Sequence, residues 1–282
     1  MRYCYIILYT FMIITAAFSV TAAPATLPGT VDWTRGSVTG YSSAMVTINS
    51  EGSPVDAESG REISLNNARI EACERAREHA FERLVRHVKD IRVDSDITIR
   101  DLLESREDTG YRFMKLISES VLFREYPVSF SSTGCRTELK IKDLIPALPF
   151  TYDSNEFPLR TDNPIKTGYS GLIIDTRGQG IEPMIFPSIF SENGLEIFSR
   201  HHIDIRKAMR NGTVSYAYNE KQADKIGRAG KHPYFTVSLR GLKGCPVLSE
   251  TDVRKILSSS ETRNALKQCR IIFIIDRNRE SQ

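Results

Sequence analysis

The chain has little net charge of either sign. Its 282 residues include 38 Lys and Arg against 35 Asp and Glu, a formal net charge of +3. This near balance gives no electrostatic footprint for nucleic acid or for an anionic membrane. Long apolar runs are also absent beyond the first 23 residues, because residues 172–174 and 271–275 are only of strand length. We therefore expect no nucleic-acid partner and no membrane-spanning segment in the mature chain.

The one long apolar stretch lies at the N-terminus. A basic residue precedes an apolar run over residues 5–20, and small residues follow it. This order is typical of a cleavable secretory signal, assigned here to residues 1–23, with an uncleaved anchor as the alternative. Cleavage after Ala22 fits best, since a cut after Ala23 would leave Pro24 directly behind it. The mature protein is expected to be soluble and periplasmic.

Cysteines are few. Cys4 leaves with the signal, and Cys73, Cys135, Cys245 and Cys269 remain. Four cysteines in an oxidising compartment permit two disulfides in three pairings, and free buried thiols fit the sequence equally well. There is no C-x-x-C and no pair of histidines four residues apart, so the spacing matches no zinc pattern. We predict neither a metal site nor a cofactor.

Catalytic signatures are absent as well. No G-x-S-x-G elbow occurs, and residues 227–231 (GRAGK) lack the spacing of a phosphate-binding loop and follow a polar segment. One polar cluster is notable: Asp175 and Arg177 come directly after the apolar residues 171–174, where ligands bind in α/β sheets. The favoured interpretation is that both side chains hydrogen-bond within a Gly-rich turn. A ligand site is the alternative, which a deep pocket beside Asp175 would support.

Residues 65–88 form the clearest element. Apolar residues recur there every three or four positions with charged residues between them, and Ser64 is placed to cap the N-terminus. This predicts a helix of about 25 residues whose Ala-rich seam packs closely on a sheet. Strands before residue 143 are predicted at residues 31–48, 91–99, 121–130 and 135–141, and a short helix at residues 113–120.

Two cysteines fall on faces that should pack together. Cys73 lies on the apolar side of the helix, and Cys135 lies on the apolar face of the strand predicted at residues 135–141. We predict a Cys73–Cys135 disulfide, with Cys245–Cys269 as the complementary pair.

The prolines mark a domain boundary. Four of the twelve fall between residues 144 and 165, which we interpret as a linker. The fold class is α+β: a module over residues 24–143 with a helix on an antiparallel sheet, then an α/β module over residues 166–276 and a tail at residues 277–282. Its elements are predicted at residues 171–175, 184–198, 202–209, 220–226, 234–242, 249–266 and 271–275.

Several strings of residues together resemble a known family. The most specific is YSGLIIDTRG at residues 169–178. The others are VDW with Gly36, the Ala-rich helix, residues 91–95 with Thr98, the hairpin, Ser249 with Asp252, and residues 266–276. In this order they resemble bacterial periplasmic proteins related to the FlgT flagellar-assembly proteins and to the Lpp-twenty type of outer-membrane lipoproteins. The chain departs from this family in two ways. No lipobox cysteine ends the signal, and Cys73 and Cys135 are not part of the family's pattern of residues.

The resemblance implies a function without catalysis. It points to an exported envelope protein that acts through protein–protein contacts in flagellar or outer-membrane assembly, with envelope or flagellar basal-body proteins as partners. The family defines no catalytic residues, so none is assigned. The rival hypothesis is a periplasmic small-ligand-binding protein or enzyme with its site near Asp175 and Arg177.

Overall fold

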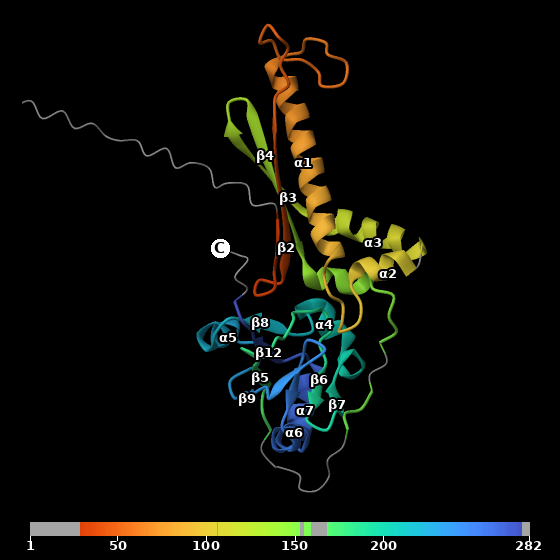
Figure 1. Ribbon diagram of the computed structural model, residues 1–282, viewed down its shortest axis with the longest axis vertical. Coiled ribbons are helices and arrows are strands. Elements are labelled where there is room, and N and C mark those ends of the chain that lie inside the picture. The colour runs from red at the N-terminus through yellow and green to blue at the C-terminus, as the bar shows by residue number, and fades with distance from the viewer. Residues whose placement is uncertain (1–28, 106, 153–154, 159–167, 278–282) are drawn as a thin grey trace, which may run out of the picture.

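The fold is α+β, as the sequence predicts. The computed structural model describes residues 29–105, 107–152, 155–158 and 168–277. The predicted signal peptide and most of the tail lie outside these residues. Figure 1 shows two parts, an elongated helix-and-sheet arm above and a rounded body below that contains the C-terminal strands.

The arm is built on one antiparallel sheet of strand order β1-β2-β4-β3. Its strands are β1 (Thr30–Asp32), β2 (Ser37–Met45), β3 (Leu122–Ser129) and β4 (Ser132–Lys140). Helix α1 (Leu65–Lys89) covers one face with its predicted seam, and Ser64 caps it by accepting a 3.2 Å hydrogen bond from the Asn67 amide. The long helix, its cap and the hairpin that it covers are therefore confirmed.

Small residues let the helix approach the sheet closely. Gly40 of β2 faces Ala80 of α1, and a Cβ at Gly40 would overlap the Ala80 carbonyl oxygen and come within 2.7 Å of Thr137 Oγ1. The Thr137 hydroxyl lies at 3.1 Å from the Ala80 carbonyl and at 3.2 Å from that of Gly40. It thereby supplies a hydrogen bond where the helix and sheet backbones lie in close contact.

The predicted strand at residues 91–99 does not form. Ile99 begins α2 (Ile99–Ser105), and α3 (Glu107–Ser120) follows. The preceding residues fold into a tight turn in which Asp94 Oδ1 accepts from the amides of Asp96 and Ile97. Three of the four alternating apolar residues are buried as expected and Ile97 is half-buried, but this turn hydrogen-bonds with the body instead of a strand of the arm.

The body contains two further sheets. One is parallel with strand order β8-β12-β5-β9, and the other is mixed with order β10-β11-β6-β7. The strands are β5 (Leu172–Asp175), β6 (Ile189–Ser191), β7 (Glu196–Phe198), β8 (Ser215–Ala217), β9 (Tyr234–Val237), β10 (Arg240–Leu242), β11 (Cys245–Leu248) and β12 (Ile271–Ile274). The helices are η2 (Arg200–His202), α4 (Ile205–Asn211), α5 (Glu220–Ile226), α6 (Glu250–Leu257) and α7 (Ser260–Lys267).

Most elements of the body match the predictions, with one strand divided in two. The strand expected over residues 234–242 is β9 in one sheet and β10 in the other, because Ser238 turns the chain and its amide bonds to the Asp175 carbonyl. The helix expected after Ser249 is two short helices, and Ser249 does cap the first. The hairpin expected over residues 184–198 forms as β6 and β7.

The expected linker is partly built into the fold. Residues 141–147 form the 3₁₀ helix η1 (Ile141–Ala147), in which Leu144 and Ile145 are buried. Phe157 is also buried and stacks on His202 with 4.9 Å between ring centroids. One apolar core runs through both modules as a result. Among the described residues, no helix combines the length and apolar composition needed to cross a bilayer.

Gly40 offers a test of the close helix–sheet packing. Gly40→Ala should lower the free energy of unfolding by about 1–3 kcal/mol, because the added methyl group forces two backbones apart. Gly110→Ala is the matched control, since nothing lies within 4 Å of a Cβ at this position of α3. There the change should stabilise by about 0.5–1 kcal/mol. Urea unfolding measures both, and an unchanged midpoint for Gly40→Ala would contradict the packing.

Candidate functional site: a cationic cleft between arm and body

A large cleft lies where the arm meets the body. Its volume is about 710 Å³. Residues 33–36, in the turn between β1 and β2, and residues 140–145, where β4 runs into η1, form the wall on the arm side. The wall on the body side comprises the end of α4 with β8, together with residues 268–270 before β12. Neither module forms this cleft alone.

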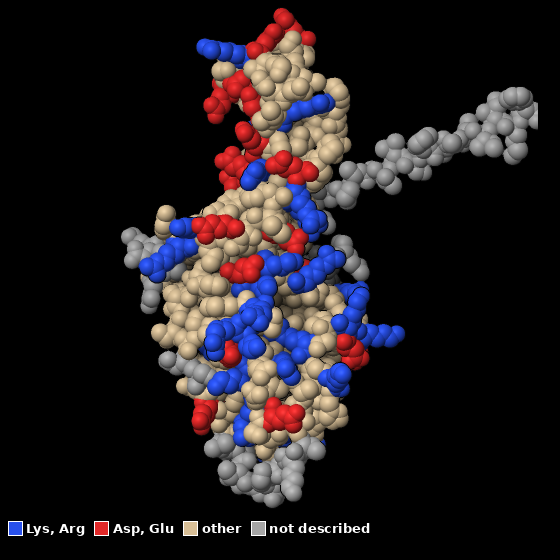
Figure 2. Space-filling view, turned by 180° about the vertical axis from the view of Figure 1, so that it is seen from behind, with Lys and Arg blue, Asp and Glu red and all other residues tan. Residues whose placement is uncertain are grey.

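The charge of the lining is of one sign. Seven of the described lining residues are Lys or Arg, and none of them is Asp or Glu. They are Arg35, Lys140, Lys142, Lys207, Arg210, Arg228 and Arg270. Figure 2, which views the face opposite to that of Figure 1, shows basic side chains gathered over the body, whereas acidic ones are frequent on the arm. The near-neutral chain thus contains a strongly positive hollow.

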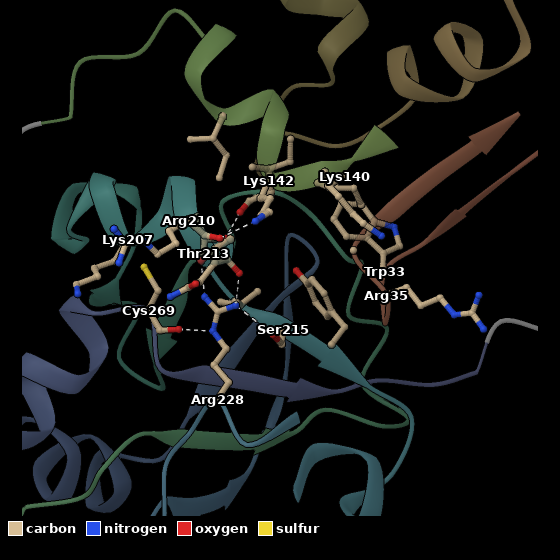
Figure 3. Close-up of a pocket in the computed structure, with 18 of the residues that line it drawn as sticks. Trp33, Arg35, Lys140, Lys142, Lys207, Arg210, Thr213, Ser215, Arg228 and Cys269 are labelled. Carbon is tan, nitrogen blue, oxygen red and sulfur yellow. Dashed lines mark hydrogen bonds between the residues drawn. The ribbon is translucent and has the colours of Figure 1, made fainter. Parts of the chain in front are cut away.

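Two of these cations are neutralised by neighbouring carboxylates. Arg35 Nε lies 3.5 Å from a carboxylate oxygen of Asp32, and Lys140 Nζ lies 2.6 Å from one of Glu138. In Figure 3 the Arg35 side chain also points away from the other labelled cations. These two residues therefore add little to the positive potential inside the cleft.

Two more cations cap a helix. Arg228 donates to the carbonyls of Asn211, at 2.7 Å, and Gly212 at the C-terminal end of α4, and to the carbonyl of Cys269. Lys142 Nζ donates to the Arg210 carbonyl at 2.8 Å from the opposite wall. Figure 3 shows both groups converging on this helix end. Cations at a helix C-terminus satisfy carbonyls that have no partner within the helix, so their primary role is structural.

The remaining three cations have no carboxylate partner within the part of the chain described. They are Lys207, which is half-buried, and Arg210 and Arg270, which are exposed. Burial lowers the pKa of nearby Arg228 below its usual range, which shows the cost of holding charge in this cleft. Like charges gathered without counter-charge repel one another, and a bound anion relieves that repulsion.

The floor of the cleft is apolar and aromatic. Trp33 packs edge-on against Tyr216 with ring centroids 5.5 Å apart, and Ile145, Met184 and Val214 also contribute to the lining. The Tyr216 hydroxyl is held by the backbone of Met184, donating to its carbonyl at 2.9 Å and accepting from its amide at 3.0 Å. The arrangement can therefore hold an anionic molecule that also has an apolar part.

The predicted cluster at Asp175 and Arg177 lies elsewhere. Arg177 Nε donates to Asp175 Oδ1 at 2.9 Å, and its Nη2 bonds to Glu220 at 2.5 Å. The amide of Gly178 donates to Asp276 at 2.8 Å, which fixes the same turn. Neither Asp175 nor Arg177 lines the cleft or the two smaller hollows described. The hydrogen bonds that the favoured interpretation expects are present in this turn. The choice between this interpretation and a ligand site stays a prediction.

All four described cysteines are free thiols in the structure, so neither proposed disulfide is present in it. Cys73 and Cys135 are nevertheless neighbours. Burial raises the pKa of the Cys73 thiol to about 11, and the nearby Glu125 and Cys135 add to the rise. Burial likewise raises the pKa of Cys135. Cys245, beside Arg92, and Cys269, beside Arg228, have no charged neighbour in common among the described residues. The Cys73–Cys135 pairing remains a prediction.

The sequence contained only a faint signal for the cleft. Its lining comes from six separate stretches of chain, so no local motif describes it. Lys140 and Lys142 share the polar face of a predicted strand, which would ordinarily be read as solvated. The GRAGK segment follows a helix instead of opening one as a phosphate loop does, since Gly227 ends α5 in the left-handed conformation, with φ of 66°. It does, however, supply Arg228 to the cleft.

One comparison with known proteins concerns the body. Residues 171–277 match a family model described as the second domain of Treponema pallidum Tp0624. No curated protein matches the chain. The matched stretch contains the body's wall of the cleft, whereas residues 33–36 and 140–145 fall outside it. The match names neither FlgT nor the Lpp-twenty type, so the flagellar link stays a prediction.

The ion pair at the turn yields a stability prediction. Hydrogen bonds from Arg177 hold the pKa of Asp175 below its usual value of 3.8. A carboxyl with a lowered folded-state pKa stabilises the protein above its unfolded-state pKa, and this contribution is lost as the pH falls. Asp175→Ala should therefore lower the melting temperature at pH 7, and the difference from wild type should shrink below pH ~4.

The control is Asp224→Ala, an exposed position of α5 whose carboxylate has no partner among the described residues. Its melting temperature should equal that of the wild type at both pH values. An Asp175→Ala protein that melts normally but has lost its function would instead identify the turn as a site.

The cysteine pair yields a second prediction. In protein purified from its native compartment, non-reducing peptide mapping should find Cys73 joined to Cys135. A bridge that closes a loop of roughly 60 residues contributes about 4 kcal/mol to stability. The peptides that contain Cys245 and Cys269 serve as internal controls for oxidation during work-up. Recovery of Cys73 and Cys135 as free thiols would remove the claim.

Proposed function

We propose that this chain is an exported protein of the bacterial cell envelope that works by binding, without catalysis, and that the cleft holds an anionic part of its partner. The observation that carries this proposal is the set of three cations without carboxylate partners, Lys207, Arg210 and Arg270. Like charges that lie near one another destabilise the folded state. Such residues are typically kept where the function of the protein requires them.

Further support comes from the chemistry of the lining. The described lining residues include no Asp, Glu or His, the usual general acids and bases, so the cleft supplies charge and hydrogen-bond donors rather than proton transfer. Burial raises the pKa of the Cys269 thiol to about 11, which keeps it protonated and weakly nucleophilic at neutral pH. These features favour binding over an enzymatic role.

The proposed location and partners rest on the sequence. The first 23 residues have the order of a secretory signal, which favours a periplasmic protein. The family resemblance favours partners among envelope or flagellar basal-body proteins. The rival hypothesis, a small-ligand site or enzyme at Asp175 and Arg177, has no observation in its favour, because their mutual ion pair already accounts for both side chains.

The chain's only tryptophan makes the proposal directly testable. Trp33 lines the cleft, so its fluorescence reports on occupancy. Titration of the mature protein with citrate or inorganic phosphate should give a saturable fluorescence change, with calorimetry as a second measurement. In the triple variant Lys207→Ala/Arg210→Ala/Arg270→Ala, affinity should fall about tenfold or more, since each charge-assisted contact is worth on the order of 1 kcal/mol or more.

The matched control is Lys221→Ala/Lys225→Ala/Lys231→Ala. These are three exposed lysines of the body that lie outside the cleft. This variant has the same loss of net charge, so it separates local binding from general electrostatic attraction. Equal affinities in the two triple variants would refute the proposed function. So would the absence of saturable binding of every anionic ligand tested, whether citrate, phosphate or an acidic peptide.

A further inference from the structure

We infer that the occupant of the cleft is a segment of a partner protein in which acidic side chains alternate with apolar ones. This inference rests on the proposed function, because it names the chemical class of the anion. It follows from where the cations without partners lie, from what occupies the centre of the cleft, and from the apolar floor.

The cations without carboxylate partners come from two elements, and the two exposed ones mark the rim of the cleft. Lys207 and Arg210 project from α4, whereas Arg270 comes from the turn before β12. Arg210 and Arg270 are exposed to solvent. A compact dianion such as phosphate is bound best by donors that converge on one point. Three cations from two elements instead match a ligand that carries more than one negative charge.

The centre of the cleft is unfavourable for a compact anion. The C-terminal end of α4 faces it, and the carbonyls of Asn211 and Gly212 bring the negative end of a helix there. Arg228 already donates to these two carbonyls, and Lys142 donates to the neighbouring carbonyl of Arg210. Most donors of Arg228 are thus engaged, and an anion is better placed toward the rim.

Between the cations lies a surface suited to apolar side chains. Trp33, Ile145, Met184, Val214 and Tyr216 line the cleft beneath the rim. Burial of apolar side chains there contributes roughly 25 cal/mol per Å² of area, which adds affinity that charge alone does not supply. A ligand with both acidic and apolar groups uses the rim and the floor together.

The size of the cleft agrees with this class of ligand. Its volume of about 710 Å³ lies within the range of about 300–1,000 Å³ found for pockets that take drug-sized ligands, far more than one phosphate fills. The walls come from both modules, so a bound segment would touch Lys142 on one side and α4 on the other. An acidic partner also associates faster with a positively charged surface than a neutral partner does.

The test uses three short synthetic peptides and inorganic phosphate, each titrated into the mature protein with Trp33 fluorescence and calorimetry. The first peptide alternates Glu with Leu, the second has Gln in place of each Glu, and the third has Ser in place of each Leu. The Glu–Leu peptide should bind at least about tenfold more tightly than either control peptide, because only it uses charge and apolar contact together.

The second part of the test uses the protein variants and changes in ionic strength. Binding of the Glu–Leu peptide should weaken about tenfold in the variant lacking Lys207, Arg210 and Arg270, and should be unchanged in the variant lacking Lys221, Lys225 and Lys231. Raising the ionic strength from about 0.05 to 0.5 M should weaken it as well, since rim charges are screened. Thermal melting of each variant checks that the fold is intact.

The outcomes separate the two claims. If phosphate or citrate binds in the cleft but the Glu–Leu peptide binds no more tightly than its Gln or Ser counterpart, the peptide inference is overturned and the proposed anion-binding function stands. If neither the anions nor the peptide bind, both claims fall. If the Gln peptide binds as well as the Glu peptide, the cleft is an apolar groove and the charges have no part in recognition.

Discussion

The attachment of one turn of the arm to the body determines the remainder of the architecture. The amides of Ile185 and Phe186 donate to the carbonyls of Arg92 and Val93 at 3.0 and 2.7 Å. An ion pair of 3.0 Å between Arg200 and Asp94 adds a side-chain contact at the same junction. Buried backbone hydrogen bonds are costly to break without replacement, so the two modules are held in one relative position. The cleft exists because its two walls are fixed by this junction.

The cations of the cleft differ in their partners, and the described carboxylates of the body lie outside the cleft. A nearly neutral chain therefore has a positive cleft. Most described carboxylates near the body are engaged elsewhere, as Asp175 is with Arg177 and Glu182 with Arg92. Within the cleft, Arg228 acts on the end of α4 and stabilises the fold. Arg210 and its unpaired neighbours have no such structural partner among the described residues, and this difference in pairing separates structural cations from those available to a ligand.

Local sequence patterns predicted the helices and strands whose buried face follows the spacing of their own apolar residues. The α1 seam, the Ser64 and Ser249 caps and the β3–β4 hairpin all follow from spacing or from side-chain chemistry within a few residues. The failures have another cause. Alternating Ile and Val at residues 91–99 predicted burial at three of four positions. The turn at Asp94, however, leaves the carbonyls of Arg92 and Val93 to accept hydrogen bonds from the body. Residues 234–242 divide between two sheets for a similar reason.

The sequence by itself determined the α+β class, the arm's helix and its face against the sheet, and the pairing of Asp175 with Arg177. These features depend on neighbours within a short stretch or on the period of apolar residues. Only the tertiary structure decided that Lys142, Lys207 and Arg270 line one cleft, because segments far apart in the chain form its walls. Apolar residues recur with the period of the helix or strand whose face they bury, so their spacing predicts that face. Charged residues of a site follow no such period, so only the folded structure shows which of them lie together.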